Sequence, residues 1–261
     1  MEKLRINTFG RSSLHEVAVR DSLYAAEDLE VELNQTQSSK AQMRELLDGT
    51  WQLVHTNADN VIWWDEDNGA DFVIVLALPS TPGQTLVVRP EITGYADLRG
   101  KVLAVDAAES GYVTPLRVLL SQAGLTTEGA DYTFLEVGST QQRVDALKDG
   151  RAVGAVIGEA QAKEMVAQGF PSLDSINRLY TNHAGSAAVR HSWVEHKQDL
   201  LLRYLRAHLR ALKATGVTPT FSWDGLAETV QMRHDVGLLR GPVDPHRFAN
   251  DMWFKIALED L

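Results

Sequence analysis

The chain has 261 residues, of which 44% are hydrophobic and 23% charged, an ordinary composition for a globular protein. Its 25 Lys and Arg against 35 Asp and Glu give a formal net charge of −10. Because nucleic-acid-binding surfaces need clustered basic residues, we expect no nucleic-acid partner. Cysteine is absent, which excludes disulfides, thiol nucleophiles and Cys-ligated metals.

Targeting signals are also missing from the sequence. No apolar run approaches the roughly 20 residues that span a bilayer, so we expect no membrane insertion. No apolar signal core follows Met1. The sequence therefore predicts a cytoplasmic location, or a periplasmic one if a leader has been trimmed.

The first 89 residues alternate between short apolar runs and helical periodicity. Ser followed three residues later by Glu or Gln fits a capping box at Ser13 and at Ser39. The alternation indicates an α/β lobe. Its strands are predicted over residues 4–8, 29–33, 52–55, 72–78 and 84–88, and its helices over 13–26, over 39–48 and through 63–64.

The same pattern restarts after residue 90, and Ser139 with Gln142 forms a third capping box. Strands are predicted over 101–105, 132–137, 153–157 and 186–189, helices over 111–123, 139–149, 159–168 and 192–215, and two further helices beginning at Asp224 and Asp244. We therefore predict two α/β lobes with a cleft between them and a helical C-terminal tail. Lobe one comprises residues 1–89 and 190–261, and lobe two comprises 90–189.

Polar residues gather at the predicted strand-to-helix turns, where open α/β sheets place small ligands. Free helix N–H groups and the helix dipole attract anions there. A guanidinium at Arg11 could hold an acid group with two hydrogen bonds, whereas each capping serine could equally be only a cap. The predicted ligand-binding residues are Gly10, Arg11, Ser38, Ser39, Thr56, Asn57, Asp106, Ser110, Gly111, Tyr112, Gly138, Ser139 and His183, with Gln37 in the second of these turns.

Two further residues have side chains that could move a proton. His55 ends a buried strand, where a histidine acts as a general acid or base or is simply a core residue. Glu159 follows an apolar strand; a carboxylate there contacts a ligand donor, transfers a proton or forms an ion pair. The sequence contains no H-E-x-x-H, P-loop, G-x-G-x-x-G or G-x-S-x-G motif. We therefore predict no metal and no cofactor.

Several longer segments in order carry a family resemblance: LLDGTWQLVHTNADNVIWW, DLRGKVLAVDAAESGY and EVGSTQQRVDALKDGRAVGAVIGEAQAKEMVAQGF. They resemble the type II periplasmic binding proteins, and within them the group that binds nitrate, sulfonates, taurine and pyrimidine precursors. The resemblance covers residues 4–215. It implies two lobes that close like a hinge on a small organic ligand. Some relatives with this fold are cytosolic enzymes, and the export signal or lipoprotein cysteine of the transport proteins is not seen here.

Two functions follow from these observations. The first is binding of a small organic acid or aromatic anion in the interlobe cleft. The alternative is a cofactor-free lyase, decarboxylase-like or dehydratase-like, in which His55 or Glu159 moves a proton and Arg11 holds the substrate's acid group. A third possibility, the effector domain of a transcription regulator, lacks a helix-turn-helix segment ahead of Met1. The sequence leaves the ligand's identity and the oligomeric state open.

Overall fold

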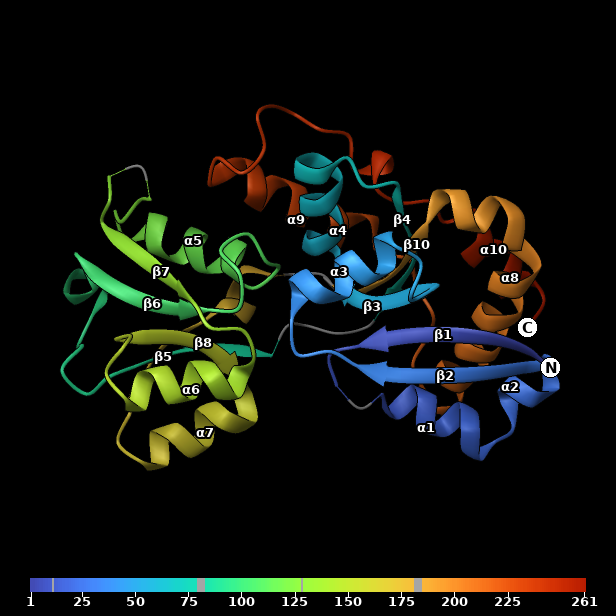
Figure 1. The fold of residues 1–261 in the computed structure, drawn as a ribbon, viewed down its shortest axis with the longest axis horizontal. Coiled ribbons are helices and arrows are strands. Elements are labelled where there is room, and N and C mark those ends of the chain that lie inside the picture. Colours follow the sequence, from blue (N-terminus) through green and yellow to red (C-terminus); the bar gives the residue numbers. More distant parts are fainter. Residues whose placement is uncertain (11, 79–82, 128, 181–184) are drawn as a thin grey trace.

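The computed structural model describes residues 1–10, 12–78, 83–127, 129–180 and 185–261. These residues form two α/β lobes, each built on a five-stranded sheet (Figure 1). The strand order is β2-β1-β3-β10-β4 in the first sheet and β7-β6-β8-β5-β9 in the second. The two-lobed α/β architecture predicted from the sequence is confirmed.

Lobe one has apolar side chains on both faces of its sheet. Along β4, Val73 and Val75 pack into a core with α1, α8 and α10, while Phe72 and Ile74 pack into a second core with α3, α4 and α9. The strands are β1 (Glu2–Thr8), β2 (Leu29–Gln35), β3 (Leu53–Asn57), β4 (Phe72–Leu78) and β10 (Gly185–Arg190). The helices are α1 (Ser13–Arg20), α2 (Leu23–Ala26), α3 (Ser39–Leu47), α4 (Ala58–Asn68), α8 (His191–Ala214), α9 (Trp223–Asp235) and α10 (Met252–Glu259), with the 3-10 turn η3 (Pro245–Arg247).

Lobe two repeats this two-faced pattern. On β6, Leu103 and Val105 pack against α5, while Ala104 packs with α6 and α7 on the other face (Figure 1). The strands are β5 (Gln84–Val88), β6 (Lys101–Val105), β7 (Tyr132–Glu136), β8 (Gly154–Gly158) and β9 (Ser172–Ser175). The helices are α5 (Val113–Gln122), α6 (Thr140–Lys148) and α7 (Glu159–Ala167), with the 3-10 turns η1 (Tyr95–Leu98) and η2 (Ile176–Leu179).

Two strands do not belong to the sheet that the predicted lobe boundaries assign them to. Strand β5 pairs antiparallel with β8 in the second sheet, and β10 pairs antiparallel with β3 and β4 in the first. The predicted boundaries at 89/90 and 189/190 placed β5 in lobe one and β10 in lobe two. The error arises because apolar runs of this length reveal a strand but not its hydrogen-bonding partner.

Two of the predicted helix caps are displaced by one residue. The caps of α1 and α3 are Ser12 and Ser38, whose side chains accept hydrogen bonds from the backbone N–H groups of His15 and Ala41. In each Ser-Ser pair the first serine has extended backbone, as a cap requires, and the second already belongs to the helix. The third box is confirmed: Ser139 caps α6, and Gln142 Oε1 accepts from the backbone N–H of Ser139.

Helix lengths also differ from the prediction at both ends of the chain. The helix expected over 13–26 is broken into α1 and α2, because Ser22 takes the left-handed conformation (φ 57°). Asp244 begins only the three-residue η3, and the last helix starts at Met252. The tail does pack on lobe one, but α9 also contacts α5 of lobe two and therefore bridges the lobes.

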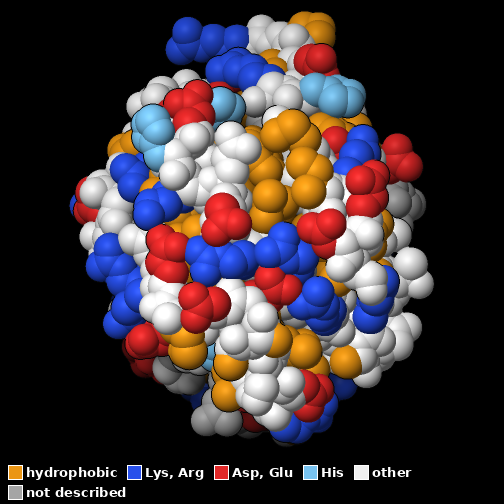
Figure 2. Space-filling view, turned by 90° about the vertical axis from the view of Figure 1, so that its right-hand side faces the viewer, with side chains coloured by type: hydrophobic (Ala, Val, Ile, Leu, Met, Phe, Trp, Pro, Cys, Tyr) orange, Lys and Arg blue, Asp and Glu red, His pale blue; other side chains and the backbone are white. Residues whose placement is uncertain are grey.

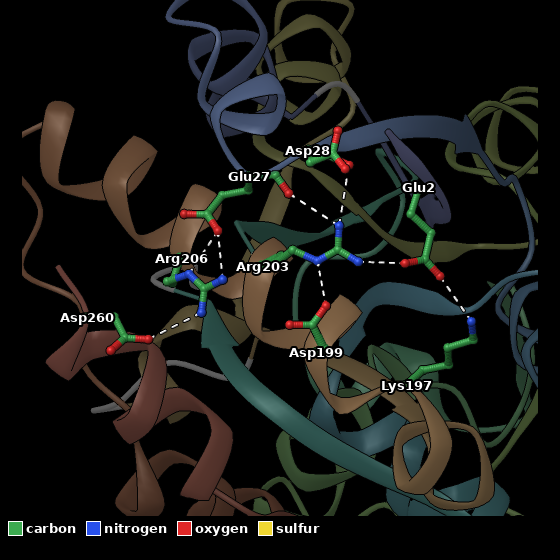
Figure 3. A network of polar contacts seen from close by, with 8 residues as sticks. All are labelled: Glu2, Glu27, Asp28, Lys197, Asp199, Arg203, Arg206 and Asp260. Atoms are coloured by element: carbon green, nitrogen blue, oxygen red, sulfur yellow. Dashed lines mark hydrogen bonds and ion pairs between the residues drawn. The ribbon is translucent and has the colours of Figure 1, made fainter.

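Ion pairs link neighbouring elements at the end of lobe one where both termini lie. Acidic and basic side chains are interspersed over this end rather than separated (Figure 2). Arg203 and Lys197 of α8 hold Glu2 of β1, and Arg206 reaches both Glu27 and Asp260 (Figure 3). These contacts tie the first strand, α2 and the C-terminal helix to α8.

A fully buried ion pair joins the C-terminal tail to α4. Arg233 Nη1 of α9 lies 2.6 Å from Asp59 Oδ1, and both side chains have no exposed surface. Burial raises the pKa of Asp59, and the positive charge of Arg233 opposes that rise. The same guanidinium also donates to the carbonyl oxygen of Glu109 in lobe two, at 3.5 Å.

Breaking this pair is expected to be costly because it leaves one buried charge uncompensated. We expect Arg233→Met to lower the free energy of unfolding by about 3–5 kcal/mol, measured by urea denaturation. The double variant Arg233→Met/Asp59→Leu should recover most of that loss. Arg151→Met, which breaks an exposed pair with Asp149, should cost under ~1 kcal/mol. Equal losses in the two single variants would contradict the assignment.

Candidate functional site

A pocket of about 190 Å³ lies between the lobes, at the carboxyl ends of the parallel strands. Lobe one provides the turns after β1 and β2. Lobe two provides the turns after β6 and β7, the first turn of α6 and the first residue of β5. The lining residues are Phe9, Thr36, Gln37, Gln84, Asp106, Tyr112, Gly138, Ser139, Thr140 and Arg143.

Arg143 is the buried cation of this pocket. Its side chain is 4% exposed, and its Nη1 and Nη2 donate to the carbonyl oxygen of Val156 (2.6 Å) and to Thr140 Oγ1 (2.9 Å). Its Nε has no hydrogen-bond partner, and no carboxylate pairs with it among the described residues. Burial lowers the pKa of Arg143, partly offset by the charge of Asp106. The guanidinium is therefore fixed in place without a paired carboxylate, and Asp106 offsets its charge only in part.

The first turn of α6 adds to the positive potential at this end of the pocket. Gly138, Ser139 and Thr140 all line it, so the free N–H groups and the dipole of the helix start lie beside Arg143. Gly138 has φ 86°, and a Cβ there would lie 2.8 Å from Gln142 Oε1. Glycine is favoured at this turn because L side chains rarely adopt this positive φ.

Asp106 supplies the opposite charge, but its oxygens are already engaged. Ser39 of lobe one donates to Oδ2 at 2.5 Å, and Ser110 donates to Oδ1. Two hydroxyl donors stabilise the carboxylate and reduce its repulsion of an anion in the same pocket. The Ser39 contact also crosses from one lobe to the other.

Other contacts bring the lobes together beside the pocket. Lys40 of α3 pairs with Glu136 at the end of β7, with Nζ 2.6 Å from Oε2. The backbone N–H of Gly111 donates to Asn60 Oδ1 at 2.8 Å. A Cβ on Gly111 would lie 2.8 Å from Asn57 Cβ. Lobe two therefore approaches the start of α4 as closely as a glycine allows.

The structure gathers some of the predicted binding residues and separates others. Asp106, Tyr112, Gly138 and Ser139 line the pocket, and Gln37 lines it too. Arg11 and His183 lie outside the described residues. Thr56 does not line the pocket, and its hydroxyl accepts from Asn60 Nδ2 within lobe one. The other predicted residues do not line the pocket either and instead cap a helix, join the lobes or neighbour a lining residue: Gly10, Ser38, Ser39, Asn57, Ser110 and Gly111.

Neither predicted catalytic residue lies in the pocket. His55 points to the opposite side of the sheet, where its Nε2 lies 2.7 Å from Tyr204 Oη in the core against α8. Glu159 begins α7, accepts a hydrogen bond from Asn177 Nδ2 at 3.1 Å, and lines a separate groove formed by α7, β5 and β9. Strand alternation turns His55 into the core, and Glu159 is an exposed residue at the start of α7.

Sequence reasoning missed the lining residues Phe9, Thr36, Gln84, Thr140 and Arg143. Arg143 had a usable signal, because a cation near the start of a helix is unfavourable to the helix dipole and needs another reason to be there.

Among the residues that the structure describes, no group of three or more His, Asp or Glu side chains is arranged to hold a metal ion. Over the same ranges, no helix combines the length and apolar character needed to cross a membrane.

Comparison with known proteins identifies the family. A family model described as "ABC transporter, phosphonate, periplasmic substrate-binding protein" matches residues 17–225. The chain belongs to this family. No curated protein sequence matches. The family's description gives the expected cytoplasmic location no support.

Solved structures share the fold at low identity. A Bordetella bronchiseptica RB50 protein has a TM-score of 0.81 at 16% identity, with 100% of this chain and 98% of that chain covered. The alkanesulfonate-binding protein of Xanthomonas axonopodis pv. citri, bound to MOPS, has a TM-score of 0.77 at 17% identity, with 95% of this chain and 98% of that chain covered. The nitrate-binding protein of Synechocystis PCC 6803 has a TM-score of 0.70 at 16% identity, with 88% of this chain and 65% of that chain covered. The predicted type II periplasmic-binding-protein fold is confirmed.

Two buried histidines make the stability of this substrate-binding protein pH-dependent. Tyr204 Oη lies between His55 Nε2 (2.7 Å) and His208 Nδ1 (3.3 Å), with His15 and Tyr24 at the edge of the cluster. Burial lowers the pKa of His55 to about 3 and of His208 to about 4, and neighbouring histidines lower both further. Folding therefore favours the neutral rings. Their contribution is complete above the unfolded pKa near 6.5 and is lost as the pH falls towards 4 and 3.

We expect the free energy of unfolding to fall between pH 6 and pH 4 by up to ~1.4 kcal/mol per pH unit for each histidine. Urea denaturation at pH 7, 6, 5 and 4 measures this slope. His208→Gln should remove one histidine's share of this slope, up to ~1.4 kcal/mol per pH unit. His196→Gln, at an exposed position of α8, should leave the slope unchanged. Identical slopes in the two variants would show that the buried pair does not bind these protons.

The close approach at Gly111 gives a second prediction. Gly111→Ala places a methyl group against Asn57, so the lobes must separate, and we expect a larger radius of gyration by small-angle X-ray scattering. Gly94→Ala, whose Cβ would meet no atom within 4 Å, should scatter like the parent protein. An unchanged radius in a folded Gly111→Ala protein would refute this geometry.

Proposed function

We propose that this protein binds a small organic anion in the pocket between its lobes, with Arg143 holding the acid group. The observation that carries the proposal is the buried guanidinium without a carboxylate partner. An isolated charge is costly to bury, and buried charges in proteins are normally paired. A ligand carboxylate, sulfonate or phosphonate supplies the missing negative charge and accepts from a planar fork of N–H donors.

Neighbouring groups support the same type of ligand. The start of α6 favours an anion by ~0.3–1 kcal/mol, and the hydroxyls of Ser139 and Thr140 retain a proton to donate because each is already an acceptor. Phe9 and Tyr112 provide aromatic surface for the organic part. The structural relatives named for alkanesulfonate and nitrate binding agree with this charge.

The enzyme alternative has no comparable support. It relied on His55 and Glu159, and both lie outside the pocket. Burial also lowers the pKa of His55 to about 3, far below the range in which a general base works near neutral pH. A ligand recovered unchanged after incubation, as judged by NMR, is the expected result for binding alone.

Replacement of Arg143 tests the proposal. Isothermal titration with ethanesulfonate, ethylphosphonate and propionate compares three acid groups on the same two-carbon chain. We expect at least one to bind, and Arg143→Met to weaken it about 10- to 100-fold, since a hydrogen bond to a charged group contributes about 1.5–3 kcal/mol. Arg151→Met removes an exposed charge from the same lobe and should bind like the parent. Equal affinity in both variants, or no binding of any probe, would overturn the proposal.

A further inference from the structure

The pocket wall contains acceptors as well as the donors around Arg143. Asp106 and Gln84 both line it, and the two oxygens of Asp106 accept from Ser39 and Ser110. Gln84 differs from Asp106 because its acceptor is not engaged. Its side chain is 8% exposed, and its Oε1 is buried with no hydrogen-bond partner among the described residues.

The backbone of Gln84 is held firmly, so the side chain cannot easily withdraw from the pocket. Its carbonyl oxygen accepts from Ser175 Oγ at 3.2 Å, and its N–H donates to Asn177 Oδ1 at 3.4 Å. It also pairs with Gly158, the last residue of β8. Strand β5 runs antiparallel to β8, which places the first residue of β5 at the edge where β8 ends.

A buried amide oxygen without a donor is unfavourable by about 1–3 kcal/mol. None of the described residues that line the pocket donates to this oxygen, whereas a hydrogen-bond donor on the ligand would. Because Gln84 and Arg143 line the same small pocket of about 190 Å³, such a donor lies only a few bonds from the acid group held at Arg143.

We infer that the ligand carries a hydrogen-bond donor, such as a hydroxyl group, on a short chain from its acid group, and that Gln84 is the residue that recognises it. This inference rests on the proposed function, because Arg143 positions the acid end. A site that hydrogen-bonds a substrate hydroxyl discriminates strongly against the analogue that lacks it, since the buried polar group of the protein is then left unpaired. Gln84 thus selects substituted acids over plain alkyl acids and inorganic anions.

Matched probes test this directly. Ethanesulfonate and 2-hydroxyethanesulfonate differ by one hydroxyl group, as do ethylphosphonate and 2-hydroxyethylphosphonate. We expect the parent protein to bind the hydroxylated member of at least one pair ~10-fold or more tightly by isothermal titration. In Gln84→Met, a change of similar length without the amide, that ratio should fall close to one. Gln168→Met, at an exposed position after α7, should keep the parent's ratio.

The outcomes distinguish failure of the role of Gln84 from failure of the proposed anion-binding function. If the hydroxylated and plain members bind the parent with equal affinity in every pair that binds, the role of Gln84 is refuted and the anion-binding function stands. If Gln84→Met keeps the parent's preference, another residue recognises the hydroxyl and the inference is again refuted. If no probe of either pair binds, the proposed function itself fails for these acids. The parent's ratio is informative without any variant, so a Gln84→Met protein that failed to fold would still leave the inference open to refutation.

Discussion

A buried guanidinium that lacks a carboxylate partner sets the electrostatics between the two lobes. The molecule shows what compensation looks like elsewhere: Arg233 is equally buried, and Asp59 lies 2.6 Å from it. Arg143 instead has a carbonyl oxygen and a hydroxyl as acceptors. Those neutral partners fix the direction of the side chain without cancelling its charge. The remaining positive potential is thus directed into the pocket, as an anion site requires.

Asp106 near that cation does not defeat anion binding, because the lobes jointly moderate its charge. One hydroxyl comes from lobe two, Ser110, and the other from lobe one, Ser39. The Ser39 contact joins the lobes and at the same time stabilises the carboxylate beside the proposed anion site. The Lys40–Glu136 pair also joins the lobes.

Local pattern was enough to predict most of the strands and helices, although not β9 or the break between α1 and α2. It also indicated lining residues that follow parallel strands, such as Asp106, Tyr112 and Ser139. It was not enough for Gln84, because a residue that begins a strand reaches this edge only if the strand is antiparallel, and apolar runs do not reveal pairing. Arg143 was missed for a different reason. Helical side chains lean towards the N-terminus, so a residue one turn inside α6 reaches the pocket. A search limited to the strand-to-helix turns ends at the helix cap and does not include it.

The one-residue displacement of a helix cap has a direct consequence for the site. Ser38 caps α3 by accepting from the N–H of Ala41, and the hydroxyl of the adjacent Ser39, buried at 2% exposure, donates across the lobes to Asp106. A pair of serines therefore divides two roles between adjacent positions: the first ends the loop and starts the helix, and the second makes a contact between the lobes. Capping statistics alone cannot separate these roles, because the second depends on a partner 67 residues away in sequence.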